Sequence, residues 1–181
     1  MAGVGRGSLR DIREAVMLAK DGTLKAHGYD RLVIDSLTEL QRFFKDEIVS
    51  SRDGGFDGTF SQQEWGVLTE KMRRFMRTLR ALPIPVIATA LIDEISTTVN
   101  GREVSSYRPS FEGRKTAGET AQYFNAVGFC IKKDKQGTVE HATMFDGPAR
   151  YVTKSCGDVV GGVAAPDPVK WLQSIRGLSS E

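Results

Sequence analysis

Apolar positions along the chain recur at two spacings, one typical of amphipathic helices and the other of buried strands. Helical spacing predicts four main helices, over residues 9–20, 37–49, 61–82 and 166–175. Short apolar runs predict three strands of a sheet, at residues 31–34, 86–91 and 127–132. We also expect a short helix over 120–126 and a terminal hairpin in which residues 139–145 pair with 150–154.

Three segments show neither spacing. Residues 1–7 are rich in glycine and predict a flexible lead-in, and the Gly- and Asp-rich stretch 50–60 predicts a mobile loop. The polar stretch 93–118 has little periodicity, and its length predicts a second mobile loop with a function. Helices alternating with strands, followed by a β-rich end, predict a single α/β domain over residues 1–181, with a mainly parallel sheet flanked by helices.

The composition is that of a globular protein. Hydrophobic residues are 40% and charged residues 27% of the 181, which excludes a fibrous or disordered chain. The net charge is only +2, so any nucleic-acid site must come from a local patch. No apolar run approaches the ~20 residues of a membrane helix. Two cysteines and two histidines argue against a disulfide scaffold or a metal centre. We therefore expect a cytoplasmic protein without membrane contacts.

The strand at 31–34 runs directly into Asp35 and Ser36, so that residues 32–36 read LVIDS. Apolar residues followed by an acid have the form of a Walker B strand, in which the carboxylate holds Mg²⁺ through its water shell. The same pattern arises when an aspartate caps the next helix. The residues by themselves leave both interpretations open.

A nucleotide hydrolase also needs a phosphate cradle, usually G-x-x-x-x-G-K-[ST] between a strand and a helix. No such string occurs in the 181 residues. The glycines at 3–7 have neither a lysine nor a preceding strand, and GRKT at 113–116 lacks the earlier glycine at the required offset. Neither stretch is predicted to form a phosphate loop.

Positive charge is concentrated in two places. The helix over 61–82 carries five cations close to a single acid, Glu70: Lys71, Arg73, Arg74, Arg77 and Arg80. The stretch 93–118 adds cations interleaved with aromatic side chains: Arg102, Tyr107, Arg108, Phe111, Arg114 and Lys115. These residues suit contacts to a phosphate backbone and stacking on single-stranded bases. A solvated helix face and an ordinary surface loop would show the same pattern.

Several stretches together resemble the RecA-like ATPases of phages, nucleotide-binding proteins linked to single-strand annealing and recombination. The matching residues are 29–40 (YDRLVIDSLTEL), 63–91, 108–129, 149–159 and 166–175. They cover most of the chain in the expected order. The resemblance implies a RecA-like fold of the P-loop NTPase superfamily, with ATP and Mg²⁺ as cofactors.

The resemblance also implies roles for individual residues. Asp35 would be the Walker B acid that holds Mg²⁺ through water, Ser36 would lie beside the metal, and Thr89 would sense the γ-phosphate. Residues 93–118 would correspond to the DNA-facing loop. Lys154 would belong to a Lys-x-Arg pair that reaches a neighbour's nucleotide, although a cysteine stands two residues later where the arginine is expected.

The family's first part, with the Walker A strand, loop and helix, has no counterpart in these residues. The resemblance therefore implies an N-terminally truncated version of the fold. Without that central strand, we expect a rearranged sheet or a homo-oligomer formed through the exposed strand edge. Without the cradle and the arginine, phosphoryl transfer loses most of its electrostatic stabilisation. We expect a chain that does not hydrolyse ATP alone.

Three functions remain open from the sequence. The leading hypothesis is a DNA recombination or replication protein, in the host cytoplasm if phage-encoded, that binds single-stranded DNA or a partner ATPase. The second is an active ATPase whose phosphate loop comes from a separate polypeptide. The third is a structural or regulatory interaction protein that binds neither nucleotide nor DNA.

Overall fold

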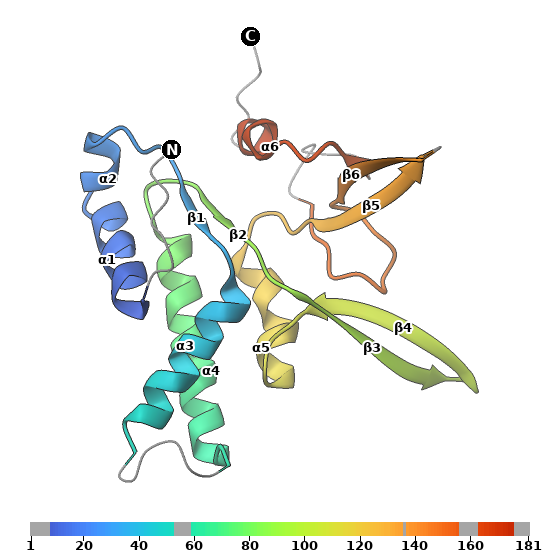
Figure 1. The fold of residues 1–181 in the computed structure, drawn as a ribbon, viewed down its shortest axis with the longest axis horizontal. Coiled ribbons are helices and arrows are strands. Elements are labelled where there is room, and N and C mark those ends of the chain that lie inside the picture. The colour runs from blue at the N-terminus through green and yellow to red at the C-terminus, as the bar shows by residue number, and fades with distance from the viewer. Residues whose placement is uncertain (1–7, 53–58, 136, 156–162, 176–181) are drawn as a thin grey trace. The chain divides into compact units, whose positions relative to one another are not determined.

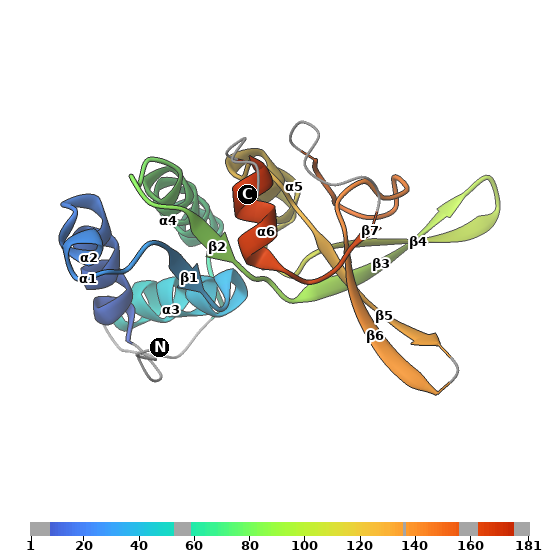
Figure 2. The same ribbon diagram turned by 90° about the horizontal axis from the view of Figure 1, so that it is seen from above.

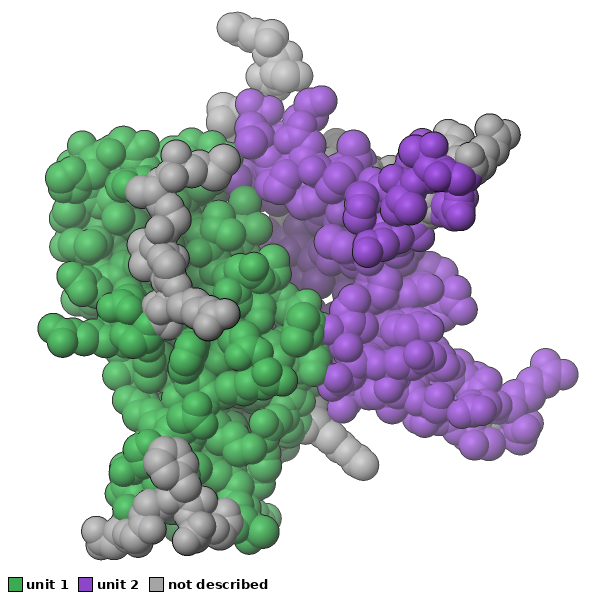
Figure 3. Space-filling model, viewed as in Figure 1, with its two compact units in different colours: residues 1–91, 110–117 green, residues 92–109, 118–181 purple. Residues whose placement is uncertain are grey.

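The computed structural model describes residues 8–52, 59–135, 137–155 and 163–175 (Figures 1 and 2). Helices and small sheets of two or three strands make it a mixed α/β structure. The chain divides into two compact units (Figure 3). Unit 1 holds residues 1–91 and 110–117, and unit 2 holds residues 92–109 and 118–181.

Unit 1 is built from helices and one pair of strands. Its elements are α1 (Leu9–Lys20), α2 (Thr23–Ala26), β1 (Leu32–Ile34), α3 (Leu37–Ser50), α4 (Gln62–Arg80) and β2 (Val86–Ala88). β1 and β2 are parallel, and Leu32 pairs with Val86. The three predicted helices and the two predicted parallel strands of this region are confirmed, although β2 is shorter than the apolar run at 86–91.

Apolar side chains on facing sides of α3 and α4 form the core of unit 1. Leu40 and Phe44 of α3, and Leu68 and Met72 of α4, are each at most 3% exposed. The ring of Phe44 meets that of Phe75 edge to face, with centroids 5.8 Å apart. The members of each helix recur at a spacing of four, which places them on one helical face. This regular spacing is why the sequence pattern located both helices.

Side-chain caps fix where two of these helices begin. Ser8 and Asp11 form a capping box at α1, and Ser61 and Glu64 form another at α4. In each box the backbone N–H of the serine donates to the carboxylate at 2.7 Å. The predicted starts of both helices are therefore confirmed.

Unit 2 is dominated by antiparallel strands. Its elements are β3 (Ile92–Val99), β4 (Arg102–Pro109), the 3₁₀ helix η1 (Thr120–Tyr123), β5 (Phe129–Lys135), β6 (Thr138–Met144), β7 (Val163–Ala164) and α6 (Pro168–Ile175). α5 (Arg114–Glu119) begins in residues of unit 1 and ends in residues of unit 2. The predicted closing helix is confirmed by α6, and η1 covers the first part of the predicted helix at 120–126.

The predicted extended parallel sheet is wrong for the described residues, in which β1 and β2 are the only parallel strand pair. The strand predicted at 127–132 instead forms β5 and pairs antiparallel with β6. Gly137, with a φ of 81°, supplies left-handed backbone between these two strands. A tight turn brings consecutive strands together at a lower entropic cost than pairing with a distant strand.

The predicted pairing of residues 139–145 with 150–154 is also wrong. β6 pairs with β5 along the whole of one edge, and on the other edge its last two residues, Thr143 and Met144, pair with β7. Those residues make isolated bridges instead, Tyr151 with Tyr107 and Lys154 with Val127.

Residues 93–118 are not the predicted loop. β3 and β4 pair antiparallel along their whole length, and α5 follows them. Asn100 and Gly101 connect the strands with φ values of 53° and 76°, the left-handed conformation that two-residue hairpin turns require. The β-branched residues of β3, such as Ile95 and Thr97, favour an extended backbone.

The other two segments predicted to be mobile are residues 1–7 and 50–60. The first, and residues 53–58 of the second, lie outside the described residues. Among the helices that the structure describes, none combines the length and apolar composition needed to cross a membrane.

Candidate functional site

The carboxyl ends of β1 and β2 bring Asp35 and Thr89 together. Because the strands are parallel, both ends reach the same edge of the sheet. The Thr89 hydroxyl donates a hydrogen bond to the Asp35 carboxylate. The Thr89 backbone is fixed as well, since its N–H donates to Ile34 at 3.0 Å and its carbonyl accepts from Leu37 at 2.8 Å. The acid and the hydroxyl predicted to act on a nucleotide therefore lie in direct contact, and both are exposed.

Ser36, not Asp35, caps helix α3. The Ser36 hydroxyl accepts a hydrogen bond from the N–H of Glu39 at 3.3 Å, and its backbone has the extended conformation of an N-cap. Helix capping was the alternative explanation for an acid after this strand, and it does not account for Asp35. The carboxylate of Asp35 is instead held by a hydroxyl from the end of the neighbouring strand.

Helix α3 fixes the chain on either side of the β3–β4 hairpin. Near its start, Thr38 accepts a hydrogen bond from the N–H of Leu91 at 3.1 Å. One turn later, the buried amide of Gln41 makes two hydrogen bonds to the backbone of Glu112, at 2.8 and 2.7 Å. Lys45 then pairs with the Glu112 carboxylate at 2.6 Å. These contacts hold the residues after Thr89 beside the start of the helix that follows Asp35.

The donors at this edge are suited to Mg²⁺. Asp35 offers a carboxylate, and Ser36 and Thr89 offer hydroxyls, which are hard oxygen ligands. Magnesium in nucleotide sites commonly keeps several waters and takes one or two carboxylates together with the phosphates. Within the described residues no three His, Cys, Asp or Glu side chains gather into a cluster that could hold a metal ion. The residues therefore fit a hydrated Mg²⁺ that arrives with a nucleotide.

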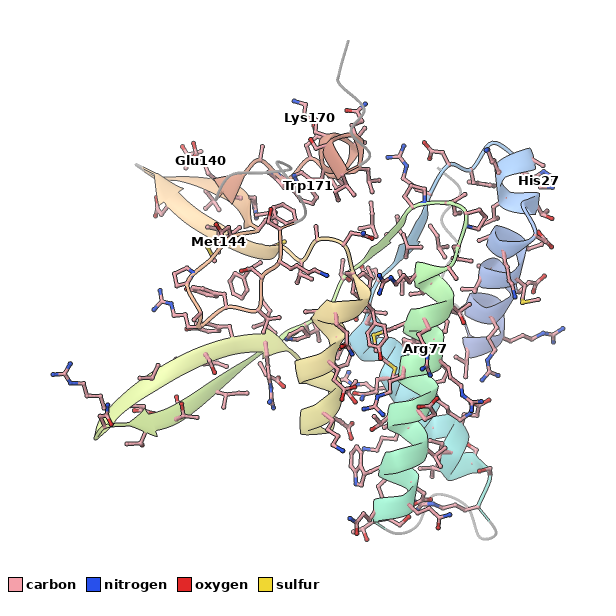
Figure 4. All side chains as sticks on the ribbon, turned by 180° about the vertical axis from the view of Figure 1, so that it is seen from behind. His27, Arg77, Glu140, Met144, Lys170 and Trp171 are labelled. Carbon is pink, nitrogen blue, oxygen red and sulfur yellow. The ribbon has the colours of Figure 1, made fainter. Side chains whose placement is uncertain are left out.

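Two of the five cations predicted as a stripe on α4, Arg74 and Arg77, contact one acid, Glu70. Arg74 and Arg77 donate to the same oxygen of Glu70, at 3.1 and 2.8 Å. The hydrogen bond from Arg74, and then the charge of Arg77, lower the pKa of Glu70. Arg77 is labelled on α4 in Figure 4. Arg80 is exposed and Arg73 is half-buried on the same helix.

Lys71, the fifth cation, has a different environment. Its ammonium pairs with Glu47 of α3 at 2.7 Å, and Arg13 of α1 pairs with the same carboxylate at 3.0 Å. Hydrogen bonds from Lys71 and Arg13 lower the pKa of Glu47. This carboxylate links three helices of unit 1. Lys71 therefore contributes to helix packing, and the structure separates it from the arginines around Glu70.

The residues predicted on a DNA-facing loop are distributed over several elements. Arg102 is exposed at the start of β4, next to the hairpin turn. Arg114 is the first residue of α5, and Lys115 follows it as an exposed side chain. Phe111 is only 5% exposed, so it belongs to the core of unit 1 and is not a surface for base stacking.

Tyr107 packs within unit 2. Its ring stacks on that of Tyr151 with centroids 5.1 Å apart, and it meets Phe129 at 5.8 Å. The Tyr107 hydroxyl donates to the Glu94 carboxylate at 3.2 Å, and this bond raises the pKa of Tyr107. Arg108 is half-buried, and its Nε is buried without a hydrogen-bond partner among the described residues.

Lys154 holds backbone in unit 2. Its Nζ donates to the carbonyl of Phe124 at 2.7 Å, and its backbone exchanges hydrogen bonds of 2.8 and 3.0 Å with Val127. Asp35 and Thr89 belong to unit 1. The cysteine at position 156 lies outside the described residues. A role for Lys154 at a nucleotide stays a prediction.

Sequence reasoning missed the part that Thr38 and Gln41 play beside the candidate site. Both are buried, at 4% and 3% exposed, although they are polar. The available signal was that Thr38 and Gln41 directly follow the apolar positions Leu37 and Leu40. A polar side chain that is buried beside such positions is nearly always hydrogen-bonded. The partner, Glu112, is distant in sequence and carries no such signal.

The candidate site lies within a range of residues that matches a known protein family. A family model described as an AAA domain matches residues 8–156, which is more than half of the chain. The comparison with curated proteins and the comparison with solved structures gave no match. The matched range includes the Asp35–Thr89 contact and the arginines of α4.

Proposed function

The chain belongs to the AAA domain family, part of the P-loop NTPase superfamily, and on that premise we propose that it binds a magnesium–nucleotide complex at Asp35 and Thr89. Family membership supports an NTPase-related role. We place that role at the edge where β1 and β2 end. We further propose that the chain binds DNA, as a protein of recombination or replication.

The observation that carries the nucleotide part is the contact between Asp35 and Thr89. Helix capping does not explain Asp35, because Ser36 is the cap. The carboxylate is nevertheless oriented, through the hydroxyl of Thr89, and it is exposed at the carboxyl edge of a parallel strand pair. Open α/β sheets bind ligands outside this edge of their strands.

Each residue has a distinct part in the proposed site. Asp35 holds Mg²⁺ through its water shell, and Thr89 orients the carboxylate and can turn its hydroxyl toward a terminal phosphate. Ser36 keeps the start of α3 in place. When bound, Mg²⁺ neutralises charge on the phosphates. The 181 residues contain no Walker A string, so a phosphate loop for hydrolysis would come from outside them.

The DNA part of the proposal is supported by charge on α4. Four arginines, at 73, 74, 77 and 80, accompany Glu70, the only acid between residues 65 and 80. Arginines donate in a geometry that matches phosphate oxygens, and phosphate contacts supply most of the sequence-independent affinity for nucleic acid. Single-stranded DNA is the proposed ligand, and a partner ATPase is the alternative occupant.

A titration with a fluorescent ATP analogue, with and without Mg²⁺, tests the nucleotide part. We expect saturable binding that needs Mg²⁺ and becomes about tenfold weaker or more in Asp35→Asn. Thr89→Val removes only the hydroxyl that orients the carboxylate and is expected to weaken binding by about tenfold. Asp46→Asn, at an exposed acid of α3, is the matched control and is expected to bind like the wild type.

Two outcomes would contradict the proposal. A folded wild type that binds no nucleotide up to millimolar concentration would leave Asp35 with a structural role only. Equal loss of binding in Asp35→Asn and Asp46→Asn would show an effect of charge, not of the site. Either result, together with a stable complex with another protein, would favour the structural or regulatory function.

A further inference from the structure

The carboxylate of Glu70 occupies the position that an anionic ligand of α4 would take. Arg74 Nε and Arg77 Nη2 converge on one of its oxygens, Oε1, at 3.1 and 2.8 Å. Two arginines directed at a single anionic oxygen resemble the arrangement by which guanidinium groups hold phosphate. The proposed function gives these arginines contacts to phosphate, but it gives Glu70 no role.

The three residues are accessible to a large ligand. Their side chains are 43%, 77% and 57% exposed for Glu70, Arg74 and Arg77. They follow each other at i, i+4 and i+7, which places them on one face of the helix. The core residues of α4, such as Met72 and Met76, are buried on the opposite face. Ion pairs this exposed are weak and exchange readily with other charged partners.

A second carboxylate of unit 1 provides the comparison. Glu47 also has two cationic partners, Arg13 and Lys71, at 3.0 and 2.7 Å. Those partners come from two other helices, so Glu47 joins α1, α3 and α4. Glu70 joins only residues of its own helix. Tertiary structure therefore needs the Glu47 pairs, whereas it does not need the Glu70 pairs.

We infer that Glu70 is an intramolecular competitor for the phosphate backbone of single-stranded nucleic acid at the Arg74–Arg77 face. In the free protein it neutralises the two arginines and keeps them oriented. A phosphate displaces the carboxylate from them, so Glu70 lowers affinity and disfavours ligands with few phosphates. This inference rests on the DNA part of the proposed function and is independent of nucleotide binding at Asp35.

Fluorescence anisotropy with a labelled oligothymidylate, over a series of salt concentrations, tests the inference. In Glu70→Gln we expect about fivefold tighter binding at low salt, the effect of one unit charge a few ångströms away in water. The slope of log affinity against log salt should steepen by about 0.7, one further phosphate contact to a single strand. Asp46→Asn, at an exposed acid of α3, makes the same change in net charge and is expected to leave both quantities near the wild type.

A double substitution of the arginines gives the second arm. Arg74→Gln with Arg77→Gln should reduce the slope by about 1.4, which is about 0.7 for each lost phosphate contact. In that background, Glu70→Gln should have no further effect. Thermal unfolding and circular dichroism of each variant verify that the protein remains folded.

The outcomes separate the inference from the proposals on which it rests. Equal tightening in Glu70→Gln and Asp46→Asn would overturn it, because the effect would then be one of net charge. Binding that is unaffected by both the acid and the arginines would also overturn it and would place nucleic acid elsewhere. No binding by any variant would overturn both the inference and the DNA part, and nucleotide binding at Asp35 would be untouched.

Discussion

Units 1 and 2 are stabilised in different ways. Four large apolar side chains of unit 1 are fully buried, Leu40, Leu68, Met72 and Met76, and the polar side chain of Thr116 is buried with them. In the described part of unit 2 the most deeply buried side chain is Thr143, and the apolar contacts are small aromatic groups. Hydrophobic stabilisation grows with the apolar area removed from water. Unit 1 therefore depends on a helical core, and unit 2 depends on strand pairing and a few ring contacts.

Because each unit has its own source of stability, we expect a substitution to destabilise mainly the unit that contains it. The two tryptophans of the chain allow this to be measured, because Trp65 lies in unit 1 and Trp171, which is labelled in Figure 4, lies in unit 2. Replacement of either one by phenylalanine leaves the other as the sole tryptophan, whose emission can be excited selectively over that of the four tyrosines.

The largest effect is expected from Met72→Ala. Met72 is 0% exposed between α3 and α4, and truncation of a buried methionine costs about 2–5 kcal/mol. Urea denaturation followed by Trp65 should show this loss, and Trp171 should report a much smaller change. Met17→Ala, at a side chain 60% exposed, is the control. Equal shifts of the two tryptophan signals would show that the units unfold as one.

A smaller effect, confined to unit 2, is expected from Tyr151→Ala. The ring stacks on Tyr107 and tilts against Phe129 with centroids 4.6 Å apart. Aromatic pairs contribute about 0.5–1.5 kcal/mol each beyond the area that they bury. Hydrogen exchange of the amides in β4 and β5 should accelerate, while exchange in α3 and α4 stays unchanged. Tyr29→Ala, at an exposed ring of unit 1, should leave amide exchange in β4 and β5 unchanged. Faster amide exchange in α4 would contradict the expectation that the effect is confined to unit 2.

The smallest effect is expected at Glu64 and depends on pH. Hydrogen bonds from Arg52, and then from Ser61, lower the pKa of Glu64 from 4.5 to about 2. A depressed pKa means that the stabilisation is present above pH 4.5 and is lost as the pH falls from 4.5 towards 2. Glu64→Gln should therefore lower the melting temperature of unit 1 near neutral pH, and the difference from the wild type should narrow with acidification. Glu14→Gln, at an exposed acid of α1, should show no such narrowing. A difference in melting temperature that stays constant at every pH would contradict the lowered pKa of Glu64.

The three long helices of unit 1, α1, α3 and α4, could be predicted because their signals are local. Periodic apolar residues and capping boxes, such as Ser61 with Glu64, lie within one helix and determine its limits. The contact between Asp35 and Thr89 could also be anticipated, since parallel strands end at one edge. The two hydrogen bonds between Gln41 and Glu112 could not, because nothing in either local segment specifies a partner so far along the chain.

The hairpins of unit 2 were missed for a different reason. β3 and β4 contain few large apolar residues, so hydrophobic periodicity gave no strand signal. The Asn100–Gly101 turn, flanked by β-branched residues, was the stronger local indicator of a hairpin. β5 was recognised as a strand but was assigned to the parallel sheet, because the order of strands depends on long-range pairing that a single segment does not encode.

The two ends of the β3–β4 hairpin lie one hydrogen bond apart, since the N–H of Ser110 donates to the carbonyl of Leu91 at 2.8 Å. Thr38 and Gln41 secure both ends to the same helix. A segment bordered in this way can lengthen, shorten or be exchanged as a cassette while the elements that hold its ends stay as they are. Such a position allows a chain to acquire a new recognition element without disturbing the strand edge that carries Asp35 and Thr89.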